Sequence, residues 1–224
     1  MIITLGFAPG IFWLWYLYQK DKWEPEPKTL VIKAFFLGIL VVIPALILEA
    51  PFQMLNLSFL LIIIVAPVVE EILKFMAMKR FIYQNAEFDE PMDGIVYATA
   101  VALGFASVEN LFYLISAQSK VMIVFAARAI LSVPGHALFS SMWGYALGQA
   151  KFSDQKRATR LIWWGLLSSI GAHCLFNLFA SITVLGGFGL LMVIGFLWWI
   201  LLRRIARVEK ASPFKEEKSL SRGL

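Results

Sequence analysis

LSFLLIIIVAPVVEEILKF, residues 57–75, joins an apolar run that is typical of a membrane span to two adjacent glutamates and a lysine. Glu70, Glu71 and Lys74 lie in the continuation of that run, where hydrocarbon is expected. A charge at the centre of a bilayer costs about 2.5–3.5 kcal/mol even on the lenient insertion scale. We therefore expect these side chains to face one another or a water-filled cavity, and not lipid.

The composition is that of a membrane protein. Of the 224 residues, 60% are hydrophobic and the mean hydropathy is +0.75, whereas an ordinary soluble domain is about 45–50% apolar. Several apolar runs reach the roughly 20 residues that cross a bilayer. The one cysteine, Cys174, excludes an internal disulfide and a C-x-x-C metal knuckle. The net charge of +5 comes from basic residues between the apolar runs, so the lipid bilayer is the expected partner and nucleic acid is not.

We predict an all-α fold, a polytopic bundle of about seven transmembrane helices. The predicted spans are 2–18, 29–49, 57–78, 94–117, 121–148, 161–184 and 187–202. Residues 1–202 are expected to form a single transmembrane domain. Residues 203–224 are expected to form a basic, disordered cytoplasmic tail.

Basic residues alternate between the joints of the predicted helices. The first, third and fifth joints carry three, two and four Lys or Arg, the second and sixth carry none, and the fourth carries Lys120 alone. Because Lys and Arg accumulate on the cytoplasmic side, the N-terminus is predicted outside and the C-terminus in the cytoplasm of a multi-pass protein.

A second group of polar residues lies inside the predicted spans. Counting about 1.5 Å of rise per residue, Glu70 lies roughly 14 Å from the cytoplasmic edge, near the middle of a core about 30 Å thick. Both histidines come out at a similar depth, and Glu109 lies somewhat nearer the outer side. We expect these side chains to meet in one pocket. The full group is Glu70, Glu71, Lys74, Glu109, Asn110, Arg128, His136, His173 and Asn177.

Carboxylates and imidazoles gathered in one pocket are the usual groups of general acid–base catalysis. We interpret Lys74 and Arg128 as charge-balancing partners, and a purely structural set of ion pairs with the glutamates remains the alternative. Asn110 and Asn177 fit either hydrogen bonds between helices or stabilisation of an oxyanion. Pro67 can loosen its helix close to the glutamates.

Two classes of function fit this pocket. One is an intramembrane hydrolase, and the other is a proton- or ion-coupled transporter, which also uses Glu and His at mid-membrane. Transporters usually show repeat symmetry and interrupted helices in both halves. No repeat is visible here, and the polar groups come from consecutive spans, so the hydrolase is favoured.

Four motifs in order resemble those of the PrsW family of bacterial intramembrane proteases, which is distantly related to the CaaX endopeptidases and bacteriocin-processing proteases. They are EEILK (70–74), GFASVEN (104–110), GHALF (135–139) and HCLFN (173–177), with similar flanks at FDEPMDGIVY (88–97) and LGQAKFS (147–153). The resemblance covers essentially the whole chain. Related sequences often have Asp where this chain has Asn177, so an acid role is not carried over to that position.

The resemblance implies site-1 cleavage of a single-pass, membrane-anchored anti-sigma factor (RsiW-like) in the bacterial cell membrane, which starts the release of a sigma factor. Glu70, Glu71, Glu109, His136 and His173 are the implied catalytic residues. We expect Glu70, helped by His173, to deprotonate a water, and Glu71 and Glu109 to position it.

Two points of this mechanism stay open at the level of the sequence. The oxyanion would be stabilised by Asn110, His136 or Asn177. The site works either without a cofactor or with Zn²⁺, which typically takes three protein ligands and a water.

Overall fold

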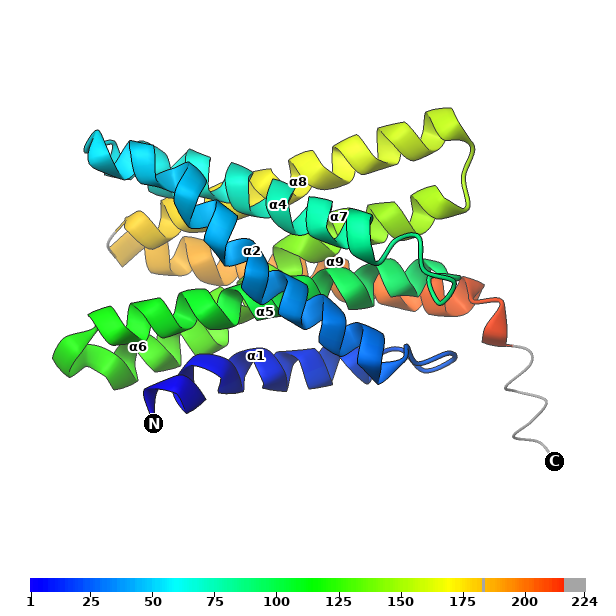
Figure 1. Cartoon of the computed structure of the whole chain (residues 1–224), viewed down its shortest axis with the longest axis horizontal. Helices are drawn as coiled ribbons and strands as arrows, with labels where there is room; N and C mark the ends of the chain where they lie inside the picture. The colour runs from blue at the N-terminus through cyan, green and yellow to red at the C-terminus, as the bar shows by residue number, and fades with distance from the viewer. Residues whose placement is uncertain (183, 216–224) are drawn as a thin grey trace.

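The computed structural model of the chain describes residues 1–182 and 184–215, and every regular element in those ranges is a helix (Figure 1). The all-α prediction is confirmed. The elements are α1 (Ile2–Tyr18), α2 (Lys28–Met54), α3 (Ser58–Leu60), η1 (Leu61–Val65), α4 (Ala66–Phe81), α5 (Pro91–Ser116), η2 (Gln118–Lys120), α6 (Val121–Ala127), η3 (Arg128–Ser132), α7 (Val133–Lys151), α8 (Gln155–Ser181) and α9 (Val184–Ala211).

In the part of the chain that the structure describes, these elements form seven continuous helical segments, and each overlaps one of the predicted spans. The segments from α3 to α4 and from η2 to α7 are each continuous, with a π-helical stretch inside. Five described helical segments, at 28–54, 91–116, 118–151, 155–181 and 186–211, are long and apolar enough to cross a membrane. The α1 helix is a shorter apolar helix of 17 residues. The count of seven spans and the orientation of the termini stay predictions.

Some boundaries differ from the prediction. The α2 helix continues five residues past 49, to Met54, and α5 begins at Pro91, three residues before 94. The α9 helix runs on to Ala211, so part of the expected tail is helical. Residues 216–224 of that tail lie outside the described residues.

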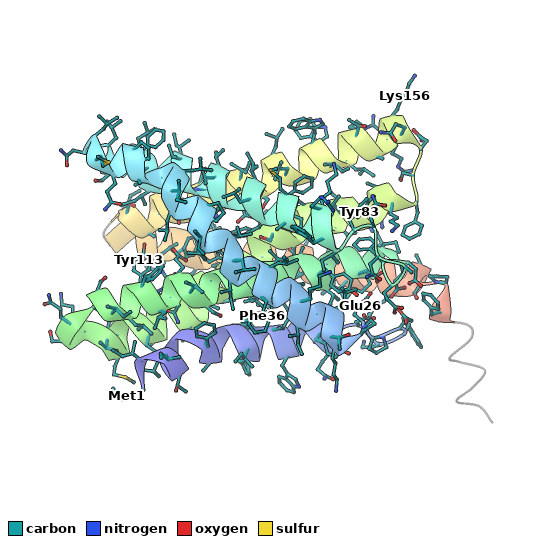
Figure 2. All side chains as sticks on the ribbon, in the orientation of Figure 1. Met1, Glu26, Phe36, Tyr83, Tyr113 and Lys156 are labelled. Carbon is teal, nitrogen blue, oxygen red and sulfur yellow. The ribbon has the colours of Figure 1, made fainter. Side chains whose placement is uncertain are left out.

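The bundle is elongated, and α1 begins at the opposite end of it from the end of α9 (Figure 1). The α1, α4 and α7 helices end near the end of α9, whereas α2, α5 and α8 end at the opposite end, where α1 begins. Figure 2 shows Glu26, Tyr83 and Lys156 toward the first end and Met1 and Tyr113 toward the second. The basic joints thus share one end of the bundle, which the charge pattern predicts to be cytoplasmic.

The α5 helix is the core of the bundle, buried on all faces from Met92 to Ser107. The α1, α2 and α7 helices pack directly against it. A Cβ atom on Gly38 of α2 would overlap the carbonyl group of Val101, and one on Gly104 of α5 would overlap that of Phe35. Small residues permit this approach of two backbones, as is common in membrane helix pairs.

We expect Gly104→Ala to lower the thermal midpoint of unfolding in detergent. Alanine favours a helix by up to about 1 kcal/mol over glycine, but overpacking a close contact costs about 1–3 kcal/mol. Gly171→Ala on α8 is the matched control, because nothing lies within 4 Å of the added Cβ there. The thermal midpoint of Gly171→Ala should equal or exceed that of the unaltered protein. Equal destabilisation of both variants would contradict the packing argument.

A buried acidic cluster closes the predicted cytoplasmic end, formed by Asp21, Glu26, Glu90 and Asp93. Tyr97 donates a hydrogen bond to Glu26, and the backbone amides of 89 and 90 donate to Asp93. No described Lys or Arg forms an ion pair with the cluster. Burial, helped by the charges of Glu90 and Asp93, raises the pKa of Asp21 to about 8. Burial likewise raises the pKa of Glu90 to about 7.

The raised pKa of Asp21 predicts a stability that falls as pH rises. The folded protein binds this proton more tightly than the unfolded chain, so the stabilisation is complete below about pH 4 and is lost through about pH 8. Asp21→Asn cannot ionise, so its thermal midpoint should exceed that of the unaltered protein by more at pH 9 than at pH 5. Parallel pH profiles of the two proteins would contradict the prediction.

Candidate active site

Two π-helical stretches stand directly before the helices that carry the site. The amide of Ala66 donates to the carbonyl of Leu61, and that of Val133 to Arg128, each five residues back. A proline follows each stretch at the start of the next helix, at 67 and 134. Since proline has no N–H to donate, it disrupts the regular α-helical bonding. This fits the expectation that Pro67 loosens its helix, and Pro134 stands in the same relation to the second stretch.

Side chains from other helices take up carbonyl groups that the π-helical stretches leave free. The amide of Asn177 on α8 donates to the carbonyl of Ile62 at 2.8 Å. The indole of Trp13 on α1 donates to the carbonyl of Ala129 at 2.9 Å. A backbone group without a partner is costly in a membrane, so these bonds make the distortions tolerable.

The ammonium group of Lys74 lies at the centre of the site. Its Nζ atom is 2.8 Å from Glu71 Oε1, 3.2 Å from Glu70 Oε2 and 3.1 Å from His136 Nδ1. The lysine is fully buried. An ammonium has three hydrogens and no acceptor, so all three are used, and His136 Nδ1 must accept. His136 is therefore neutral, with its proton on Nε2, from which it donates to Glu109.

Glu71 is fully buried and surrounded by donors. Its Oε1 also contacts His173 Nδ1 at 3.3 Å. Its Oε2 accepts from Ser140 at 2.8 Å, Ser169 at 2.9 Å and the Trp143 indole at 3.0 Å. With five donors, Glu71 is held as a carboxylate and has no room for a further partner.

Glu70 has far fewer partners than Glu71. Its only described contacts within ion-pair distance are Lys74 and, at 3.7 Å, His136 Nδ1. It also lines a cavity of about 690 Å³, which Glu71 does not. Of the two adjacent glutamates, Glu70 is thus the one that can meet a water or a substrate.

His173 is oriented from two sides. Its Nδ1 donates to the Glu71 carboxylate, and the ring of Phe139 stacks on it with centroids 4.6 Å apart. In the neutral imidazole this leaves Nε2 with a free lone pair, and His173 also lines the cavity. A histidine held by a carboxylate at one nitrogen is a usual arrangement for a base or a metal ligand at the other.

Glu109 and Arg128 form a second group beside His136. Glu109 Oε2 lies 2.8 Å from His136 Nε2 and 2.8 Å from an Arg128 terminal nitrogen. Arg128 Nε also donates to Asn110 Oδ1 at 3.1 Å. The pairing supports the interpretation of Arg128 as charge balance.

Asn110 faces the first helix. Its amide nitrogen donates to the carbonyls of Leu5 and Gly6 at 3.2 and 3.1 Å. Both amide hydrogens are then used, which favours a role as a link between α1 and α5 over stabilisation of an oxyanion. Asn177 uses one hydrogen on Ile62, and it lines the cavity.

The cavity runs from the polar cluster to the end of the bundle that holds the N-terminus. Glu70, His136 and His173 lie at its inner part, and Gln53, Ser116 and Ser181 are near the ends of α2, α5 and α8. The cavity therefore extends through the predicted outer half of the membrane.

The donors present fit a metal ion. Glu70, Glu71, His136 and His173 each offer one ligand atom, and the four atoms lie within 4.8 Å of one another. Imidazole nitrogens and carboxylate oxygens are common zinc ligands. Lys74 Nζ contacts three of the same four groups, so an ion would have to replace these ammonium contacts.

Comparison with known proteins identifies the family of the chain. The model of the "PrsW family intramembrane metalloprotease" matches residues 26–202. The chain belongs to the PrsW family. It is 34% identical to Protease PrsW of Geobacillus kaustophilus, over 96% of this chain and 98% of the relative. It is also 34% identical to Protease PrsW of Bacillus subtilis, over 94% and 97%. No solved structure matches.

Membership of the PrsW family confirms the resemblance and the prediction of a peptide hydrolase in a multi-pass membrane protein. The transporter alternative is thereby not favoured. The family description as metalloproteases also favours the metal-dependent alternative over the metal-free one.

Sequence reasoning missed three donors to Glu71, namely Ser140, Trp143 and Ser169. The feature of the sequence that could have identified these donors is their helical spacing from the histidines. Ser140 and Trp143 follow His136 by four and seven residues, and Ser169 precedes His173 by four. Residues at this spacing share a face, so each histidine marks the face on which further polar partners lie.

Glu71→Gln should destabilise the protein more than Glu70→Gln. The amide at 71 brings N–H groups to a point where five donors converge, and breaking a buried charge pair costs about 3–5 kcal/mol. At 70, Lys74 keeps its bond to Glu71, so a cost of about 1 kcal/mol is expected. Thermal unfolding in detergent measures both. An equal loss of stability in the two variants would contradict the conclusion that Glu71 depends on more hydrogen bonds than Glu70.

Proposed function

We propose that this chain performs site-1 cleavage of a single-pass anti-sigma factor in the bacterial cell membrane, on the extracytoplasmic side. The observation that supports this best is the cavity, which leads from Glu70 and His173 to the end of the bundle that the charge pattern predicts to be outside. A peptide segment that emerges from the outer face of the membrane has direct access to such a site.

In the proposed reaction, a water held between Glu70 and His173 attacks the scissile carbonyl carbon. Glu70 takes the proton of the water and passes it to the amide nitrogen as the C–N bond breaks. Glu71 acts through His173 and Lys74, whose positions it fixes. The free amide hydrogen of Asn177 is the donor that best fits the developing oxyanion, because the amide hydrogens of Asn110 are used elsewhere.

The metal that the family description implies is proposed to be Zn²⁺. His136 and His173 are the residues that would hold it, with Glu70 as the carboxylate, since five donors already surround Glu71. Bound zinc supplies a Lewis acid and a more acidic water. The contact between Glu71 and His173 already fixes the tautomer that presents Nε2.

Co-expression with a candidate anti-sigma factor tagged at both ends tests the function. Glu70→Gln and His173→Asn should each reduce cleavage by about 10²-fold or more, as expected for loss of an acid–base group. Glu209→Gln is the matched control, because Glu209 pairs with Lys22 on another part of the bundle. Cleavage that persists in both site variants would overturn the assignment.

Metal removal tests the cofactor. Purified protein treated with a chelator should lose cleavage, and added Zn²⁺ should restore it. Metal analysis of the untreated protein should find about one ion per chain, which is the number that a single group of four donors can hold. Full activity of protein that analysis shows to be metal-free would exclude the zinc site.

A further inference from the structure

Glu49 belongs to the cavity, although it lies away from the acid–base groups. The α2 helix presents Leu46, Glu49 and Gln53 to the cavity, a spacing of three and four residues that places them on one face. Gln53 belongs to this face because α2 continues to Met54, past the end at 49 predicted from hydropathy. Tyr113 and Ser116 of α5 line the same part.

Glu49 differs from the other acids around the cavity in having no partner. Its Oε1 atom is buried and accepts no hydrogen bond from any residue that the structure describes. Glu70 and Glu71 instead share Lys74, and Glu109 is paired with Arg128 and His136. A buried carboxylate oxygen without a hydrogen bond is costly, so a partner supplied from outside the chain would stabilise it.

Neither of the nearby cations, Lys74 or Arg128, forms an ion pair with Glu49 among the described residues. Lys74 uses its three hydrogens on Glu70, Glu71 and His136. Arg128 is occupied by Glu109 and Asn110, and its guanidinium stacks 3.9 Å from the ring centre of Tyr113. The walls of the cavity carry three glutamates but only one Lys or Arg among the described lining residues, Arg128. Of these glutamates, Glu49 is the one that no described cation contacts.

We propose that Glu49 is a specificity residue, which binds a Lys or Arg side chain of the peptide substrate close to the cleaved bond. This inference rests on the proposed protease function. Glu49 lies within electrostatic reach of Glu70 and Glu109, so a basic side chain bound there belongs to a residue near the reacting carbonyl. A carboxylate that is poorly solvated and unpaired discriminates strongly between a cationic and an anionic side chain.

A basic side chain fits this position better than a metal ion. Glu49 is not part of the group of His and acidic residues whose ligand atoms converge. A single carboxylate with one amide neighbour, Gln53, is a poor ligand set for a divalent cation, which takes several oxygen ligands. An ammonium or guanidinium group needs only one well-placed carboxylate and brings its own apolar stem, which suits the neighbouring Leu46 and Tyr113.

The first test measures binding, which does not require cleavage. Short apolar peptides that differ only in one central Lys, Gln or Glu are titrated into the purified full-length protein in detergent. The unaltered protein should bind the Lys peptide about tenfold more tightly than the Gln peptide, and Glu49→Gln should reduce this ratio to about one. Glu49→Lys should favour the Glu peptide. Glu209→Gln is the control that should keep the original preference.

The second test repeats the comparison as kcat/KM on the cleaved anti-sigma factor, with Lys, Gln or Glu placed in turn at each residue beside the cleaved bond. A Lys preference at one position, lost in Glu49→Gln and reversed in Glu49→Lys, is expected. Cleavage and binding that show no dependence on charge would overturn the proposal for Glu49 alone. A Lys preference in binding, with no substrate cleaved by the unaltered protein, would support the Glu49 subsite and contradict the proposed function.

Discussion

The site depends on one buried ammonium group. Lys74 lies where three acceptors meet, and its three hydrogens hold two glutamates of α4 and one histidine of α7 in a fixed relation. Like charges on adjacent residues repel strongly in a medium of low dielectric constant. The lysine makes it possible to place Glu70 and Glu71 side by side in the interior. Lys74 also fixes the tautomer of His136, and Glu71 fixes that of His173.

The two adjacent carboxylates have different surroundings. Glu71 is saturated by donors from α4, α7 and α8, so it ties three helices together as well as orienting His173. Glu70 points into the cavity and keeps its capacity to accept a proton. Because rigid surroundings keep a polar group in a fixed position, the saturated Glu71 helps to hold Glu70 where it lines the cavity.

Depth counting along apolar runs predicted much of this arrangement. The spacing of Glu70, His136 and His173 from the ends of their spans placed them at one level, and the structure brings one ligand atom of each within 4.8 Å of the others. The donors Ser140 and Trp143 were not predicted, since a serine or a tryptophan in a span is common for many reasons. The sequence did not decide whether Asn110 links helices or stabilises an oxyanion. Its partners are carbonyl groups of α1, and which helix lies beside α5 cannot be read from the sequence of α5 itself.

The π-helical stretch before Pro67 has a consequence for how this chain can vary. Between Leu61 and Ala66 the helix contains one residue more than an α-helical bond encloses. Each residue turns a helix by about 100°. The direction in which Glu70 points is therefore set by the number of apolar residues before it, and not by their identity. Exchanges among Ile, Leu and Val at 61–65 leave this number unchanged, and with it the register of the glutamates with the histidines.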